Sequence, residues 1–444
     1  MSSSAIPHSN DIHAKALAIN LEASIYGTFA EIGAGQEVAR WFLSVGAASG
    51  TVAQAISAYD KTVSDDTYGR GTRYVSRERL LAMLEHEYQL LLSRLGAERG
   101  AHTRFFVFAD TVTTRNYQGT NEQHGWLGMR FQDAPGAPSS QILLHITLGD
   151  STALLQQQAI GVLGVNLIYA AYHQRASAEI FLGGLFEDLS ADRVEIDYLE
   201  LSGPAFAAAD VRVWSLELLR KGMGQAVIFD SQGRLVEPSS LLHKRPVICQ
   251  RALLDDLGLF GAELLAGARG QLLAEGKKFE HEPVSVLEVS LHGGPGAAPP
   301  ENAEVLEQIE RLSPLGAVMV SQFVEGFHLV EYLRRHTPEP IRMVLGIAAL
   351  FKLVEGRAYQ ASPGALLEIF GRLLATDVTL YVAPMKMEPF VAALGGLPGG
   401  FVVESAESDY MTLDEFTPKA PVDQLFRYLR GAARMVPLET KSKA

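Results

Sequence analysis

The pattern of apolar and polar positions divides the chain into helical and extended stretches. In residues 76–95, apolar side chains recur at steps of three and four with charged residues between them, which predicts an amphipathic helix. Apolar runs at 104–113, 125–132 and 141–148 are separated by turn-forming segments and predict strands. The apolar stretch 151–173 predicts a buried helix, because glutamines and an asparagine leave it too short an apolar run to span lipid.

The last third of the chain has the most regular pattern. From 284 onward, apolar runs that suit strands alternate with helical patterns, which predicts parallel strands joined by helical crossovers. The expected fold class is α/β and α+β, with a C-terminal, mostly parallel open sheet that carries helices on both faces, preceded by a mixed α+β domain. The expected domains are an N-terminal helical or arm region with a glycine-rich turn (1–98), a mixed α+β domain (99–275) and an α/β open-sheet domain (276–444).

The N-terminal region is the least regular part of the pattern. Residues 11–21 suit a helix and 24–32 suit a strand. The Gly/Ala/Ser-rich segment 45–58 fits either a second strand or an arm that reaches a neighbouring subunit. Turn-forming residues at 64–73 predict a loop.

Composition and charge narrow the functional classes. The 444 residues include 51 acidic and 38 basic side chains, without a long run of either sign, so no nucleic-acid partner is expected. The single cysteine, Cys249, excludes an internal disulfide framework and a Cys-based zinc cluster, and its apolar neighbours predict burial. The twelve histidines show no metal-binding spacing, so no metal is expected. No signal segment is apparent at 1–15, which favours a cytoplasmic protein without a membrane partner.

The stretch YGTFAEIGAGQEVARWF (26–42) predicts a strand, a glycine-rich turn and a helix. Gly33 and Gly35 fit the first two glycines of a nucleotide-binding turn. Val38 occupies the position of the third glycine, and Glu37 places negative charge where a pyrophosphate would bind. Two interpretations of the turn are therefore possible, a cofactor-binding turn and a structural corner that only redirects the chain, and the structural corner is favoured.

The same turn has a second interpretation. The run from Glu31 to Gly35 is similar to the first motif of S-adenosylmethionine-dependent methyltransferases. That resemblance implies a ribose partner at the end of the next strand, where Asp60 lies.

A polar loop, TTRNYQGTNEQHGW, connects two predicted strands and supplies the catalytic candidates. Arg115 could hold an anion, and His124 could carry a proton with Glu122 orienting its ring. The alternative is a solvated hairpin, since loops are also where polar residues ordinarily lie.

Topology indicates a second candidate region in the C-terminal sheet. Ligands of open α/β sheets bind beyond the carboxyl ends of the strands. His292, Gly293 and Gly294 follow the first predicted strand, and Ser321 ends the next, so these residues are expected to contact a nucleotide-like ligand. The chain has no P-loop motif and no nucleophile-elbow motif.

Three stretches, 26–42, 115–132 and 156–172, resemble a bacterial protein family. Its members carry the labels nicotinate or nicotinamide nucleotide adenylyltransferase and, inconsistently, TonB-dependent receptor. The resemblance implies an intracellular α/β protein. The H-x-G-H phosphate-binding pattern of that transferase family is absent, because HGGP at His292 holds one histidine, so no catalytic residue is carried over.

Two functions follow as expectations. The first is an enzyme of transferase type that binds a nucleotide or another phosphate-bearing small molecule, with no particular cofactor indicated. The second is a non-catalytic, self-associating scaffold that uses the arm at 45–58. A homo-oligomer is expected in either case.

Overall fold

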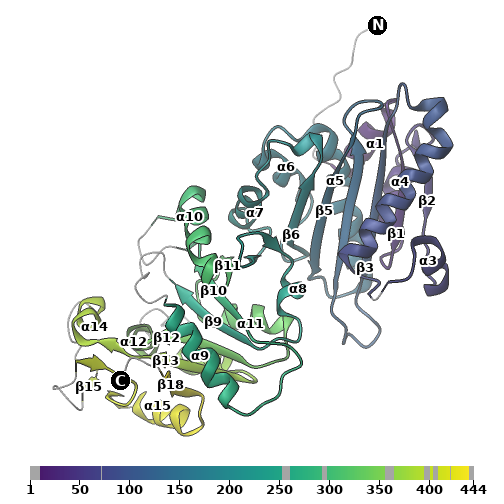
Figure 1. Ribbon diagram of the computed structural model, residues 1–444. Helices are drawn as coiled ribbons and strands as arrows, with labels where there is room; N and C mark the ends of the chain where they lie inside the picture. Colours follow the sequence, from purple (N-terminus) through teal and green to yellow (C-terminus); the bar gives the residue numbers. More distant parts are fainter. Residues whose placement is uncertain are drawn as a thin grey trace. The chain divides into compact units, whose positions relative to one another are not determined.

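The computed structural model of the chain divides into two compact units, Met1–Gln225 and Ala226–Ala444 (Figure 1). It describes residues 11–71, 73–252, 261–292, 298–355, 365–394, 401–403, 409–420 and 422–439.

The first unit is built on a six-stranded mixed sheet in the order β2-β1-β3-β4-β5-β6. β1 pairs in parallel with β2 and β3, and β3 to β6 pair antiparallel in succession. The strands predicted in the middle of the chain are confirmed. The six strands are β1 (Ile25–Ile32), β2 (Val52–Ile56), β3 (Arg104–Thr113), β4 (His124–Gln132), β5 (Ser139–Leu148) and β6 (Val194–Ser202).

Helices cover both faces of this sheet. In β3, Phe105 and Val107 pack with α3 and α4, whereas Phe106 and Phe108 join the core formed with the other five helices. Burial of both faces explains why β3 is a continuous apolar run and not an alternating one. The helices are α1 (Ile12–Leu21), α2 (Glu37–Ser44), α3 (Lys61–Tyr68), α4 (Arg77–Arg99), α5 (Ala153–His173), α6 (Ala178–Leu185) and α7 (Val211–Arg220).

The helix α5 lies in the core of the first unit, as its sequence predicts. It is long and apolar enough to cross a membrane by length and composition, but 67% of its most apolar window is buried inside the protein. Its amide side chains are used internally: Asn166 is buried and donates to the carbonyl oxygens of Leu185 and Glu187 at 3.0 and 2.7 Å.

The second unit is built on an eight-stranded sheet in the order β18-β13-β12-β9-β10-β11-β7-β8. The six strands from β18 to β11 are parallel, and β7 and β8 add antiparallel strands at one end. Numbered along the chain, the parallel strands lie in the order 3-2-1-4-5-6, in which β9 is the first strand and is central. This is the strand order of doubly wound dinucleotide-binding sheets. The strands are β7 (Ala226–Phe229), β8 (Leu235–Val236), β9 (Val247–Ala252), β10 (Val284–Ser290), β11 (Ala317–Ser321), β12 (Ile341–Gly346), β13 (Val378–Ala383) and β18 (Met435–Pro437).

Helices also cover both faces of the second sheet (Figure 1). α8 and α11 to α15 share one core with Cys249 of β9, which is fully buried as predicted. α9 and α10 bury residues outside that core, and α9 contacts β9 and β12. The predicted C-terminal, mostly parallel open sheet is therefore confirmed. The helices are α8 (Pro238–Leu242), α9 (Ala262–Ala274), α10 (Asn302–Leu312), α11 (Gly326–His336), α12 (Ile347–Glu355), α13 (Ala365–Leu373), α14 (Met387–Ala393) and α15 (Val422–Gly431). Two small ribbons complete the unit: β14 (Met385–Lys386) with β16 (Tyr410–Met411), and β15 (Phe401–Val403) with β17 (Phe416–Pro418).

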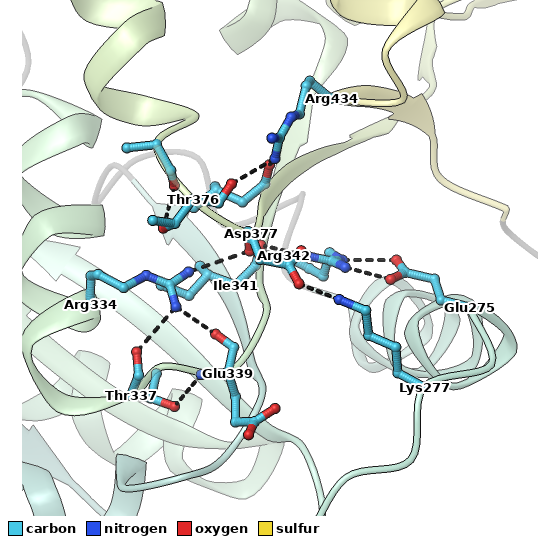
Figure 2. A network of polar contacts seen from close by, with 12 residues as sticks. Glu275, Lys277, Arg334, Thr337, Glu339, Ile341, Arg342, Thr376, Asp377 and Arg434 are labelled. Carbon is cyan, nitrogen blue, oxygen red and sulfur yellow. Dashed lines mark hydrogen bonds and ion pairs between the residues drawn. The ribbon is translucent and has the colours of Figure 1, made fainter.

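A buried arginine holds α9 against the amino ends of β12 and β13 (Figure 2). Arg342 bonds both carboxylate oxygens of Glu275, the C-cap of α9, and lies 3.1 Å from the Oδ1 of Asp377. Lys277 pairs with the other oxygen of Asp377, and Tyr381 donates to Glu275. The acidic and basic groups of this cluster satisfy one another, which indicates a structural clamp.

The unit boundaries differ from those expected at 98/99 and 275/276. β1 pairs with β3 along its whole length, so the N-terminal region shares one sheet with the predicted middle domain. The segment 247–252, expected in the middle domain, is β9, which hydrogen-bonds to β10 and β12. Backbone pairing between distant segments therefore sets the division of the chain.

Two local predictions also differ from the structure. The loop predicted at 64–73 is wrong for its first part, because Asp60 caps α3 and Ser64 and Tyr68 are buried on one side of that helix. The Gly/Ala/Ser-rich segment at 45–58 contributes β2, which pairs with β1 of the same chain.

Candidate active site

Three side chains from neighbouring strands of the first unit form a hydrogen-bonded chain. The Nδ1 of His124, at the start of β4, lies 3.0 Å from the Nε2 of His145 in β5. The Nδ1 of His145 lies 2.6 Å from the Oδ1 of Asp197 in β6. We call His124, His145 and Asp197 the histidine relay.

The placement of Asp197 depends on an irregularity between β5 and β6. His145 is opposite Tyr198 and Ile146 is opposite Ile196, so the register shifts and leaves Asp197 as the additional residue. A bulge of this kind redirects a side chain that regular pairing would point to the other face. The bulge therefore brings the carboxylate of Asp197 to the imidazole of His145.

The hydrogen bonds determine the tautomers of both rings. An ionised carboxylate can only accept a hydrogen bond, so the Nδ1 of His145 donates to Asp197 and its Nε2 is left as an acceptor. The Nδ1 of His124 must then donate to that Nε2. The Nε2 of His124 consequently carries the lone pair, and it makes no hydrogen bond to any residue that the structure describes.

Burial keeps the outer imidazole neutral. His145 and Asp197 are 2% and 1% exposed, whereas His124 is partly exposed. Burial and the neighbouring His145 lower the pKa of His124 to about 4, and Asp197 offsets only part of that effect. At neutral pH, His124 therefore presents an unprotonated nitrogen that could act as a general base.

The segment before α4 crosses the sheet close to the relay. The carbonyl oxygen of Tyr74 accepts from the hydroxyl of Thr111 in β3 at 2.7 Å. Arg77 donates to both oxygens of Glu200 in β6, at 2.9 and 2.8 Å. Because β4 and β5 lie between β3 and β6, residues 73–77 form a strap over the two strands that carry the histidines.

An aromatic group shields the inner part of the relay. The ring of Trp126 in β4 lies 5.0 Å from the ring of His145 and 5.5 Å from that of Tyr198, centroid to centroid. Trp126 is 4% exposed, so the His145–Asp197 bond is kept away from water. A low dielectric strengthens a hydrogen bond of this kind.

The structure places the other two catalytic candidates apart from the relay. Arg115 and Glu122 are exposed in the connection between β3 and β4, and the described contacts do not join either side chain to His124. The backbone N–H of Arg115 donates to Gln156 at 2.7 Å. The orienting partner expected in Glu122 is instead supplied by His145.

In the glycine-rich turn, the chain's own carboxylate caps the following helix. Glu31 accepts from the backbone N–H groups of Val38 and Ala39 at 3.0 and 2.9 Å, at the start of α2. A nucleotide phosphate would need this position. Gly33 has a φ of 98°, and a Cβ added there would lie 1.9 Å from the carbonyl oxygen of Val112. These contacts favour the structural corner.

Two further cofactor candidates are engaged in local structure. Asp60 accepts from the N–H groups of Thr62 and Val63 at 2.9 and 3.1 Å as the N-cap of α3. Gly35 has a φ of 77°, and an added Cβ would make only an ordinary contact with Glu37 at 3.9 Å, so its conformation and not crowding explains the glycine.

The candidate ligand-binding residues at the carboxyl edge of the second sheet differ in burial. Ser321 is buried and donates to Glu288 at 2.5 Å, and Glu288 pairs with Arg251 at 3.2 Å. His292 is exposed directly after β10. Gly293 and Gly294 lie outside the described residues. Between the two described members of this set, His292 is therefore the one with an accessible side chain.

The described residues contain no group of three or more His, Cys, Asp or Glu side chains arranged to hold a metal ion. The relay itself ends in a carboxylate that is buried behind two imidazoles. A carboxylate and two imidazoles joined in this way could transfer a proton.

Comparisons with known proteins give a limited likeness. No family model and no curated protein matches the chain. The competence/damage inducible protein CihA from Agrobacterium tumefaciens is similar over 38% of this chain and 98% of its own, with 17% identity and a TM-score of 0.27. The competence damage-inducible protein A (ComA) from Klebsiella pneumoniae covers 36% of this chain and 94% of its own, at 9% identity and a TM-score of 0.28. A competence-damaged protein (CinA) superfamily protein from Enterobacter cloacae covers 38% and 96%, at 11% identity and a TM-score of 0.27. TM-scores of this size transfer no function to the chain.

Proposed function

We propose that the protein is an enzyme that acts on a nucleotide or another phosphate-bearing small molecule, with His124 as its general acid–base group. The observation that carries this proposal is the hydrogen-bonded chain from His124 through His145 to Asp197. A buried carboxylate that orients one imidazole, which in turn orients a second, accessible imidazole, follows the logic of catalytic base assemblies.

The relay supports a balanced group transfer. The Nε2 of His124 takes the proton of an attacking hydroxyl group as the new P–O bond forms. It returns that proton to the oxygen of the leaving group as the old P–O bond breaks. Asp197 favours the positive charge that His124 carries between these two steps, and His145 holds the ring of His124 in place through its Nε2. The resemblance found in the sequence favours a nucleotide as the substrate and transfer as the reaction class.

A substrate panel tests the proposal directly. Purified full-length protein is incubated with nucleotides, dinucleotides and sugar phosphates, and products are identified by mass spectrometry. We expect turnover by the wild-type protein that falls about 10²- to 10⁴-fold in His124→Asn, the contribution of a positioned acid–base group. His102→Asn is the matched control, since His102 is exposed in the turn before β3. Equal turnover by His124→Asn and the wild type would remove His124 from the mechanism.

The strand order of the second unit favours a second candidate function, nucleotide binding at the carboxyl edge of β9 and β12. These strands lie where the order 3-2-1-4-5-6 reverses, and dinucleotides bind at this point in doubly wound sheets. A thermal-shift series with ATP, NAD and S-adenosylmethionine tests it, because a ligand of the native state raises the melting temperature. No shift with any of them at millimolar concentration would count against this candidate and leave the relay untouched.

A further inference from the structure

Arg73 lies at the outer end of the strap, next to Tyr74. Its side chain is exposed, and its guanidinium makes no hydrogen bond or ion pair within the described part of the chain. By contrast, Arg77 at the other end of the strap holds Glu200, and Arg79 holds Asp65 at 3.3 Å. Of Arg73, Arg77 and Arg79, Arg73 is therefore the one whose described contacts leave it available for a ligand.

The residue next to Arg73 is anchored on several sides. The hydroxyl of Tyr74 donates to the carboxylate of Asp65, with both oxygens at 3.0 Å, and its ring packs under the guanidinium of Arg79 at 5.1 Å. The carbonyl oxygen of Tyr74 is held by Thr111. The backbone at Arg73 is thus placed by its neighbour, which reduces the entropy lost when the arginine binds an anion.

The charge of Arg73 reaches the relay. It contributes to the lowering of the pKa of His124, together with His145 and against Asp197. Thr113, the residue of β3 opposite His124, is two positions from Thr111, which holds the strap. The strap residue next to Arg73 is therefore held two residues along β3 from the strand position opposite His124, at the same end of the sheet.

We infer that Arg73 binds the phosphate group of the substrate beside the Nε2 of His124, and that this pairing selects phosphate monoesters. The inference rests on the proposed function and specifies its substrate class. A guanidinium matches two phosphate oxygens at once, and a phosphate monoester titrates near neutral pH, so it can exchange a proton with an imidazole. A carboxylate is fully ionised at neutral pH, so it can accept hydrogen bonds but has no proton to exchange.

A second consequence follows from the position of the charge. A bound anion neutralises Arg73 and removes one of the causes that keep His124 unprotonated, so anion binding and proton uptake by His124 are coupled. The charged or titratable groups that act on the pKa of His124 are His145 from β5, Asp197 from β6 and Arg73 from the strap. Of these, only Arg73 is open to an added anion.

The test uses full-length protein with isotope-labelled histidine and inorganic phosphate as the probe, with the His124 resonance followed by NMR at constant ionic strength. We expect phosphate to move the titration midpoint of His124 to higher pH. Arg73→Gln should weaken phosphate binding about tenfold or more, the effect of losing a charged hydrogen bond. Arg70→Gln, an exposed arginine on the same loop, should leave it unchanged.

Three outcomes would overturn the inference: unchanged phosphate affinity in Arg73→Gln, equal weakening in Arg70→Gln, or an equal effect of acetate on His124. Both substitutions replace exposed side chains, so loss of folding does not confuse the result. His124→Asn should still bind phosphate through Arg73. Phosphate binding in a variant without turnover supports the anion site, whereas turnover that survives His124→Asn removes only the acid–base assignment.

Discussion

Glu31 of β1 lies directly opposite Asp110 of β3, and the two carboxyl groups are 1% and 0% exposed. Glu31 accepts two backbone N–H groups, whereas Asp110 accepts one, from Ile32 at 3.2 Å, and its Oδ2 has no partner among the described residues. Burial, and the charge of Glu31, raise the pKa of Asp110 well above its ordinary value. Burial raises the pKa of Glu31 to about 7, against its backbone hydrogen bonds. Burial and the neighbouring charge of Glu31 therefore favour the protonated form of Asp110.

Asp110→Asn should stabilise the protein at alkaline pH. The folded state binds the proton of Asp110 at pH values where the unfolded chain has lost it, so the free energy of unfolding falls as pH rises above the ordinary aspartate pKa. Asparagine cannot ionise and removes this slope. We expect a gain of about 1–3 kcal/mol at pH 8 and little change at pH 4, measured by urea unfolding. Asp66→Asn, an exposed control, should change neither value, and an unchanged pH slope in Asp110→Asn would contradict the raised pKa of Asp110.

Gly33→Ala should destabilise the first unit by about 2–4 kcal/mol, since it combines an unfavourable φ with a clash against the Val112 carbonyl. Gly35→Ala is the matched control, because its φ is also positive but an added Cβ would lie 3.9 Å from its nearest neighbour, the Cγ of Glu37. We expect a cost of about 1 kcal/mol there. Urea unfolding midpoints measure both, and equal costs would show that the close contact at Gly33 is relieved by a shift of the backbone.

The tautomers of the relay can be observed directly. Long-range ¹H–¹⁵N correlation spectra of histidine-labelled protein at pH 7 should show His145 protonated at Nδ1 and His124 protonated at Nδ1 with a free Nε2. In Asp197→Asn, the amide can donate to Nδ1, and His145 should change to its other tautomer. A wild-type spectrum with His124 protonated at Nε2 would be incompatible with the proposed base.

Acidification should weaken the first unit through His124. Its folded pKa of about 4 is below the ordinary value of 6.5, so the unfolded chain binds more protons between these values. The contribution of His124 to stability is complete above about pH 6.5 and is lost as pH falls toward 4. His124→Asn should reduce the pH dependence of the unfolding free energy in that window, whereas His102→Asn should preserve it.

Arg342→Met should destabilise the second unit by about 2–3 kcal/mol. The substitution removes a buried guanidinium and leaves its two acidic partners, Glu275 and Asp377, without their main cation. The control is Arg372→Met, whose pair with Glu331 is exposed on both sides. Such pairs contribute about 0–1 kcal/mol. Chemical unfolding measures the free energy of unfolding of both variants. Equally small losses of stability would show that the clamp of Figure 2 is energetically neutral.

Local patterns predicted most elements, and distant pairing supplied what they could not. The apolar run at 104–113 and the helix at 76–95 depend on neighbours in sequence, so both are confirmed as β3 and α4. The position of β9 depends on its pairing with 284–289 and 341–344, which no local pattern contains. The unit boundaries follow from that pairing and were missed for the same reason.

The candidate site shows the same division. His124 was identified because it lies in a dense polar loop. His145 and Asp197 lie within apolar strands, and their meeting depends on strand register and on the bulge beside His145. A usable signal existed: a histidine in QILLHITL and an aspartate in VEIDYLEL are polar residues at buried positions, and buried polar groups need partners. Arg73 gave no signal, since an exposed arginine in a loop is ordinary.

The central place of β9 has a consequence for synthesis of the chain. One side of β9 is completed by β10, but the other side pairs only with β12, which emerges from the ribosome after β10, α10, β11 and α11. Until residues 341–346 are released, β9 exposes an unpaired backbone edge that can recruit strands from other nascent chains. Translation that pauses between β11 and β12 would therefore produce an aggregation-prone intermediate, for which a chaperone that shields strand edges is the natural remedy.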